Sequence, residues 1–221
     1  LTMRAGLSFW AAFPLSGLIV FVLAALIGYP ALRLKGHYFA VTTFFLGHLV
    51  YLVLLNSTRL TNGAMGLRNI PPPESFFGIN FVSLQSSYYL ILIFGIVVVA
   101  VLYFLVHSGL GKILVSIREN EDLAEAIGIN TAFFKVLAFS IGAGIAGLTG
   151  SMFAHFFRLL HPTTFAWMTS EMIVIMSLVG GLGTLVGPII GAGIVTLILE
   201  LMRFAPELRF IVWSVALIIV L

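Results

Sequence analysis

The chain has 221 residues, of which 61% are hydrophobic and 9% charged, and its formal net charge is +3. A soluble domain is nearer half apolar and a quarter charged, so this composition excludes an ordinary soluble core and predicts a protein of the lipid bilayer. The small net charge offers no case for a nucleic-acid partner, and the absence of cysteine excludes disulfides and thiolate chemistry.

Long apolar runs predict the transmembrane helices, because a spanning helix needs about 20 largely apolar residues. In chain order the predicted spans are Phe9–Gly28, Tyr38–Leu55, Ser87–Val106, Ala132–His155, Met172–Leu199 and a last one that begins at Phe210 and runs to Leu221. Unbroken runs of this length favour helices over the short alternating strands of a membrane barrel. The predicted fold class is therefore all-α, a polytopic bundle of transmembrane helices.

The two ends of the chain suggest a piece of a longer membrane protein. The chain opens at Leu1 without an initiator Met, and it stops inside the apolar run "FIVWSVALIIVL". We expect residues 1–221 to form a single transmembrane domain that is truncated at both ends.

Basic residues in short loops predict which side of the membrane each loop occupies. The basic residues of Tyr29–His37 and His107–Thr131 fall on the same side if each intervening run spans once. That side is predicted to be cytoplasmic, which places the longer loop Asn56–Ser86 outside.

The run Met172–Leu199 is too long for one simple span and contains "GGLGTLVGP" in its middle. As one helix it would be about 42 Å long, against roughly 30 Å for the hydrocarbon core, so the glycines and Pro188 favour a broken element. The candidate pathway or packing residues are Gly180, Gly181, Gly183, Gly187, Pro188 and Gly191.

Small residues recur every four positions in two of the predicted spans, which allows another helix to approach closely. Gly183, Gly187 and Gly191 form one such row, and Ala143, Gly147 and Ser151 form the other. Static helix packing is the favoured interpretation of the second row, whereas the first could also belong to a moving, pathway-lining segment. The glycine run lacks the Lys-Ser/Thr of a phosphate-binding loop, so we expect no nucleotide site here.

Charge is concentrated in "SIRENEDLAEAIGIN", residues 116–130, between two apolar runs. If Gly111–Gly128 is a helix, one stripe along it is apolar and contains Ile113, Ile117, Ala124 and Ile127. A second stripe is charged and contains Arg118, Glu121, Asp122 and Glu125. Arg118 and Asp122 would then attract, Glu121 and Glu125 would repel, and Gly128 would end the helix. The segment is either a solvated loop helix or a short helix that docks on a soluble partner.

The loop between the second and third spans contains the turn-forming residues Thr61, Asn62, Gly63 and Gly66 and the triple proline Pro71–Pro73. It is either a plain connector or a rigid external loop that contacts a binding protein or partly covers a pathway. Among the five histidines, His48 lies within a span and is the one candidate for a functional role, although a histidine bonded to backbone is the commoner finding. We find no metal-type pair of histidines and no nucleophile–base pair, and the spans are nearly bare of the acids or bases that an ion-coupled transporter needs.

Several stretches resemble one family of membrane proteins. "AEAIGIN" followed by "FKVLAFSIGAGIAGLTGSMFAH" is similar to the cytoplasmic EAA-type loop and next span of permeases in ATP-binding cassette importers. The likeness is greatest to the branched-chain amino acid family and its LivM-like subunits. "PALRLKGHYFAVTTFFLG", "LTNGAMGLRNIPPP" and "MSLVGGLGTLVGPIIGAG" agree in the family's order, over most of Gly28–Phe210. The fuller EAA motif has two alanines after its Glu, whereas here Glu125 is followed by Ala126 and Ile127.

The resemblance implies a permease that forms half of a translocation pathway for branched-chain amino acids in the prokaryotic plasma (inner) membrane. Its implied partners are a second homologous permease in a heterodimer, two cytoplasmic ATP-binding subunits, an extracytoplasmic solute-binding protein and the lipid bilayer. ATP hydrolysis would occur on the separate subunits, so the chain needs neither catalytic residues nor a cofactor. The implied coupling helix contains Arg118, Glu119, Glu121, Asp122, Glu125, Ala126 and Gly128. A urea or short-amide importer permease is the alternative, and an ion-coupled transporter a weaker one.

Overall fold

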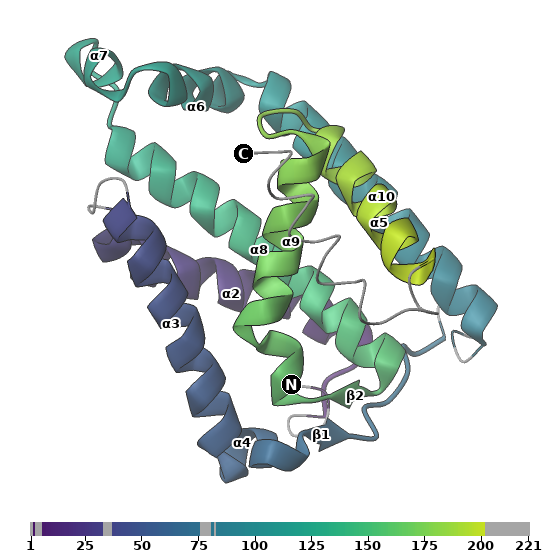
Figure 1. Ribbon diagram of the computed structural model, residues 1–221. Helices are drawn as coiled ribbons and strands as arrows, with labels where there is room; N and C mark the ends of the chain where they lie inside the picture. The colour runs from purple at the N-terminus through teal and green to yellow at the C-terminus, as the bar shows by residue number, and fades with distance from the viewer. Residues whose placement is uncertain (1, 3–5, 33–36, 76–80, 82, 202–221) are drawn as a thin grey trace. The chain divides into compact units, whose positions relative to one another are not determined.

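The structure of the protein is a computed structural model that describes all residues except 1, 3–5, 33–36, 76–80, 82 and 202–221 (Figure 1). The chain divides into two compact units, Leu1–Pro162 and Thr163–Leu221, and each is described by itself. The single-domain organisation of residues 1–221 stays a prediction, and the predicted last span, Phe210–Leu221, lies outside the described residues.

Four long helices of the first unit coincide with four predicted spans: α2 (Phe9–Ala31), α3 (His37–Asn56), α5 (Leu84–His107) and α8 (Thr131–Phe157). Within the part of the chain that the structure describes, α2, α5 and α8 are long and apolar enough to cross a membrane. The remaining elements of this unit are the short helices α4 (Thr58–Thr61), η1 (Gly63–Met65), α6 (Gly109–Glu119) and α7 (Glu121–Ala126), and the strands β1 (Leu67–Arg68) and β2 (Leu159–Leu160). Helix η2 (Pro162–Phe165) begins at the boundary, and the second unit contains α9 (Trp167–Gly180) and α10 (Gly187–Leu201).

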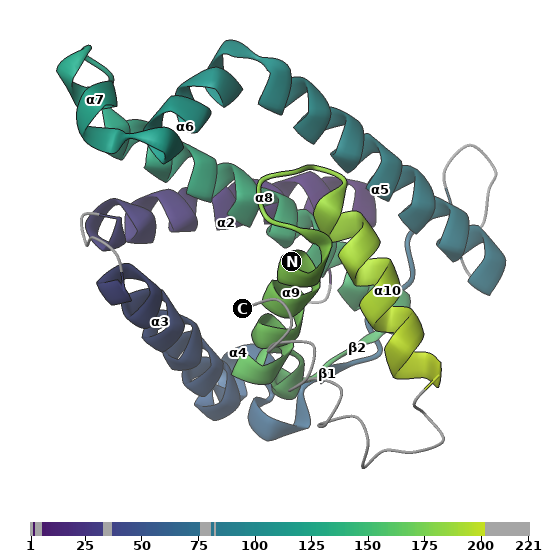
Figure 2. The ribbon, with the colours of Figure 1, turned by 45° about the horizontal axis from the view of Figure 1, so that its top comes forward.

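Helices α2 and α8 pack side by side and antiparallel in the first unit (Figure 2). Phe9, at the start of α2, contacts the ring of His155 at the end of α8 edge to face, whereas Gly28 near the end of α2 lies against Phe139. A side chain on Gly147 would begin 2.8 Å from Val20 Cβ, so only a glycine allows this approach. The predicted packing role of small residues in this span is confirmed at Gly147.

Two serines of α2 and α8 are hydrogen-bonded to backbone, whereas the buried Nε2 of His155 has no hydrogen-bond partner among the described residues. Ser16 Oγ donates to the carbonyl oxygen of Phe13 at 2.6 Å and lies 3.3 Å from that of Gly147. Ser140, which is 1% exposed, donates to the carbonyl oxygen of Val136 at 2.7 Å. These bonds matter because a buried polar group without a partner is costly where no water can reach it.

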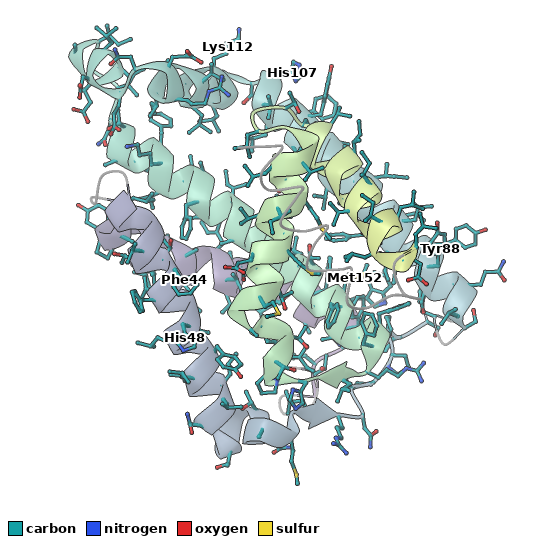
Figure 3. All side chains as sticks on the ribbon, viewed as in Figure 1. Phe44, His48, Tyr88, His107, Lys112 and Met152 are labelled. Atoms are coloured by element: carbon teal, nitrogen blue, oxygen red, sulfur yellow. The ribbon has the colours of Figure 1, made fainter. Side chains whose placement is uncertain are left out.

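The structure buries a different histidine from the one that the sequence singles out. His48 lies about midway along α3, is only partly buried and has its ring 5.8 Å from that of Tyr51 (Figure 3). His155 is 6% exposed, and its Nδ1 lies 2.7 Å from the carbonyl oxygen of Ser151. The backbone-bonded histidine expected at His48 is seen instead at His155, and the exposed His107 has a similar contact with the carbonyl oxygen of Tyr103. The centre of the His155 ring lies 4.8 Å from that of Phe9, edge to face.

We predict that Gly147→Leu destabilises the α2–α8 pair by about 1–3 kcal/mol, the usual effect of overpacking a close contact. The matched control is Gly142→Leu on the same helix, where an added side chain meets nothing within 4 Å. Both changes gain the same helix propensity, so that contribution cancels. Thermal unfolding of the detergent-solubilised protein measures the difference, and equal midpoints for the two variants would contradict the close contact.

Candidate functional site

The charged stretch forms two helices instead of the single predicted helix Gly111–Gly128. Helix α6 ends at Glu119 and α7 begins at Glu121, and between them Asn120 has an extended backbone with φ −157° and ψ 107°. The side chain of Asn120 accepts a hydrogen bond from Leu123 N at 3.0 Å. The prediction is wrong at this point because Asn satisfies a free N–H at a helix start better than it continues a helix.

A tight turn joins α5 to this α6–α7 segment. Ser108 ends α5 and caps α6, and Gly111 packs back onto the last turn of α5. A side chain on Gly111 would begin 1.9 Å from the carbonyl oxygen of Val106, so the turn requires glycine. His107 and Lys112 lie on the two sides of this turn (Figure 3).

The end of α7 is fixed by the predicted Gly128 stop. Gly128 has φ +89°, which favours glycine, and its N–H donates to the carbonyl oxygen of Glu125 at 2.9 Å. The next N–H, of Ile129, donates to the carbonyl oxygen of Ala124 at 3.0 Å. These two bonds are those of a Schellman motif, which confirms the predicted helix end. Asn130 then caps α8 by accepting from Phe133 N at 3.1 Å.

Two of the acidic side chains of α7 are held by the first turns of α8. Glu121 Oε1 forms an ion pair with Lys135 Nζ. The hydroxyl of Thr131 donates to Glu125 Oε1 at 2.6 Å and lies 3.3 Å from Glu121 Oε1. The two acids, which would repel each other in an isolated helix, thus share the Thr131 hydroxyl, and Glu121 also has the cation of Lys135 beside it. Sequence reasoning missed Thr131 and Lys135 as their partners.

The other charged side chains of the α6–α7 segment are exposed. Arg118, Glu119 and Asp122 are all exposed, and Arg118 pairs with Glu119 at 2.9 Å instead of with Asp122 as predicted. The helix break between them explains the change, because Arg118 and Asp122 no longer lie one turn apart on the same helix.

The apolar stripe of this segment is only partly buried. Ile117 and Ala124 are buried, as predicted, and Ile113 is half-buried. Ile127 is 76% exposed, so its predicted place on the buried stripe is wrong, because it follows the last turn of α7. With Leu123 at 64% exposed, the segment presents two apolar side chains beside exposed acids.

The second unit is a helical hairpin, which confirms the predicted break in Met172–Leu199. Helices α9 and α10 have 14 and 15 residues, about 21 and 22 Å at the α-helical rise, and neither alone spans a core of roughly 30 Å. The turn between them contains Gly181 and Gly183 at φ +96° and +86°. Thr184 Oγ1 accepts from Gly187 N at 3.0 Å and so caps the start of α10.

The two helices of the hairpin touch through their backbones. A side chain on Gly180 would begin 1.8 Å from the carbonyl oxygen of Gly187, and one on Gly191 would begin 2.0 Å from that of Met176. Gly183 lies in the turn and outside both helices, so the predicted row Gly183–Gly187–Gly191 is wrong at its first member. Pro188 occupies the first turn of α10, where its missing N–H removes no helix bond.

The segment after α3 is ordered by unusual backbone conformations and a pair of strands. Asn62, Gly63 and Gly66 have φ between +57° and +68°, and Thr61 Oγ1 donates to carbonyl oxygens of Leu54 and Ser57 at 2.5 and 2.8 Å. β1 pairs antiparallel with β2, with Leu67 opposite Leu160. A side chain on Gly66 would begin 2.5 Å from the carbonyl oxygen of Leu160. This order favours the rigid loop over the plain connector.

The described residues contain no group of three or more His, Asp or Glu side chains that could hold a metal ion. The described residues form apolar helices long enough to span, a hairpin of two half-length helices and an amphipathic connecting segment. Together they define the class: an all-α, multi-pass membrane protein.

The chain belongs to the family described as branched-chain amino acid transport system / permease component, whose model matches residues 1–221. It is 30% identical to the high-affinity branched-chain amino acid transport system permease protein LivM of Salmonella typhimurium and to that of Escherichia coli, over 90% of this chain and 52% of each relative. It is 25% identical to the permease protein LivH of the same Escherichia coli system, over 62% of this chain and 46% of that relative.

The chain spans about half the length of the LivM proteins that it matches. No solved structure matches it. Membership of the family confirms the resemblance seen in the sequence and makes the chain a multi-pass protein of the prokaryotic inner membrane.

For the hairpin we predict opposite effects of one methyl group at two glycines of α10. Gly191→Ala is expected to destabilise the hairpin by about 1–3 kcal/mol, because the methyl group meets the backbone of α9. Gly193→Ala meets nothing within 4 Å and should gain helix propensity, about 1 kcal/mol. Thermal unfolding in detergent tests the contrast, and a stabilised Gly191→Ala would refute the backbone contact.

Proposed function

We propose that this chain is a transmembrane subunit of an ATP-driven importer of branched-chain amino acids and forms half of its translocation pathway. The observation that carries the proposal is the match of residues 1–221 to the permease family, together with the similarity to LivM. The partners are a second, homologous permease, two ATP-binding subunits in the cytoplasm and an external solute-binding protein. ATP hydrolysis belongs to the ATP-binding subunits, so this subunit is not itself an enzyme.

Residues Arg118–Gly128, at the end of the α6–α7 segment, are the proposed contact with an ATP-binding subunit. Supporting this role are the exposed acids Glu119 and Asp122, which lie close in sequence to the exposed apolar side chains of Leu123 and Ile127. Such a mixture fits a groove with an apolar floor and a basic rim, since apolar contact provides affinity and charge provides orientation. Arg118 and Ala126 belong to the same exposed part of the segment.

The α9–α10 hairpin is the proposed pathway element. Its turn exposes backbone polar groups, and irregular backbone at membrane depth is tolerated only where it lines a cavity or is covered by protein. A branched-chain amino acid is a zwitterion with an apolar tail, which suits apolar helices with backbone dipoles and hydroxyls such as that of Thr184. The ordered segment with Thr61, Asn62, Gly63 and Gly66 is the proposed contact with the external binding protein.

We expect the importer, reconstituted in proteoliposomes with its partners, to take up leucine, isoleucine and valine only when ATP is present on the cytoplasmic side. Radiolabelled uptake normalised to the assembled complex is the measurement. Uptake of urea in place of leucine would favour the urea or short-amide alternative. Leucine uptake driven by an ion gradient without ATP would instead indicate an ion-coupled transporter.

For the orientation we predict that cysteines at Ala64 and Glu119 are labelled from opposite sides of the membrane. Both positions are exposed, and the chain has no cysteine of its own. Ala64→Cys should react with an impermeant maleimide in intact cells, and Glu119→Cys only after permeabilisation, because the basic residues place the α6–α7 segment inside. Reaction of both from outside would overturn the proposed orientation.

A further inference from the structure

We propose that Lys135 and Thr131 clamp α7 to the start of α8, so that the two helices move as one body. The clamp consists of four side chains, Glu121, Glu125, Thr131 and Lys135, and Lys135 is its positioning residue. The proposal rests on the proposed function, in which the exposed side chains of α7 receive a movement from an ATP-binding subunit.

Apart from the Asn120 cap and the two hydrogen bonds of the Gly128 turn, α7 buries little against the rest of the chain. It has six residues, far fewer than an isolated helix needs for stability, and Ala124 is its one buried residue. On one side it meets the extended backbone of Asn120, and on the other it ends in the Gly128 turn. Either junction could act as a pivot if α7 were not tied to a longer helix.

The clamp has the geometry to provide that tie. Thr131 is 3% exposed, and the side chains of Lys135 and Glu121 are 28% and 33% exposed, so the charges are partly shielded from water and salt. An ion pair in this position is stronger than one on an open surface. Loss of the Lys135 charge would leave Glu121 and Glu125 to repel each other beside a single shared hydroxyl.

The helix at the other end of the clamp is well placed to carry a movement into the membrane. α8 packs along α2 through Gly144, Gly147 and Gly17, where the two backbones approach closely. A displacement of a clamped α7 therefore moves the α2–α8 pair, whereas an unclamped α7 would turn about Asn120 and leave that pair behind.

The test compares Lys135→Gln with Lys112→Gln, which removes the same charge from an exposed position on α6. Two further variants test the ion pair itself: Lys135→Arg, which keeps the charge, and the exchange Glu121→Lys with Lys135→Glu, which reverses it. Each variant is assembled as the whole importer in proteoliposomes. The readouts are the affinity of the permease pair for its ATP-binding subunits and the ATPase activity stimulated by substrate-loaded binding protein.

We expect Lys135→Gln to lower the stimulated ATPase activity about fivefold, the lower end of coupling between sites, with affinity for the ATP-binding subunits little changed. Lys112→Gln should behave as wild type, and both Lys135→Arg and the charge exchange should restore most of the stimulation. Equal stimulation in Lys135→Gln and Lys112→Gln would overturn the clamp. If Lys135→Gln does not assemble, the charge exchange decides: recovery supports the pair and continued failure refutes it.

A variant of the exposed side chains separates the clamp from the proposed function. Asp122→Lys should weaken binding of the ATP-binding subunits if α7 docks on them, and it leaves the four clamp residues in place. Wild-type binding and stimulation in Asp122→Lys would refute docking through α7, and the clamp would then have no coupling role. If Asp122→Lys binds the ATP-binding subunits weakly, docking through α7 is supported. If the stimulated ATPase activity of Lys135→Gln also equals that of Lys112→Gln, only the clamp is refuted.

Discussion

The close approach of helix backbones at glycine is the constraint on which both compact units depend. Lipid is as apolar as leucine, so burial of apolar side chains does not drive helices together inside a bilayer, and close van der Waals contact has to do so. In the first unit Gly17, Gly144 and Gly147 bring α2 and α8 together, and in the second Gly180 and Gly191 join the hairpin. Other large apolar side chains of these helices, such as Leu26, Ile173 and Leu197, are exposed to what surrounds the chain.

Charged side chains lie near the ends of the long helices, because a charged group is costly inside the hydrocarbon core. The α6–α7 segment gathers acids where α8 begins, and it divides them between two roles. Glu121 and Glu125 are bound by Thr131 and Lys135, whereas Asp122 is exposed. One short helix therefore has side chains bound within its own chain and side chains that are exposed, which is the arrangement that the proposed coupling role requires.

Local chemistry accounts for the parts of the fold and site that the sequence predicts well. Uninterrupted apolar runs predict the four long helices of the first unit within a few residues of their ends, and the glycines with Pro188 predict the broken hairpin. Gly128 ends α7 as predicted, because its left-handed conformation depends on that residue alone. The break at Asn120 was missed because asparagine is tolerated within helices and preferred at their starts, and residue type does not choose between the two.

The sequence by itself therefore determined that this is an all-α membrane protein, which family it resembles and where its charge gathers, since composition, periodicity and motifs are local properties. The tertiary structure alone decided which acids are bound by α8, because that depends on the turn at Gly128 that brings Thr131 and Lys135 beside Glu121 and Glu125. The tertiary structure also decided that Gly183 lies in the turn between α9 and α10, whereas Gly180 contacts the backbone of α10. It decided, too, that His155 is buried and His48 is not. The role of each glycine or histidine depends on the helix that packs against it, and the residue type alone does not specify that neighbour.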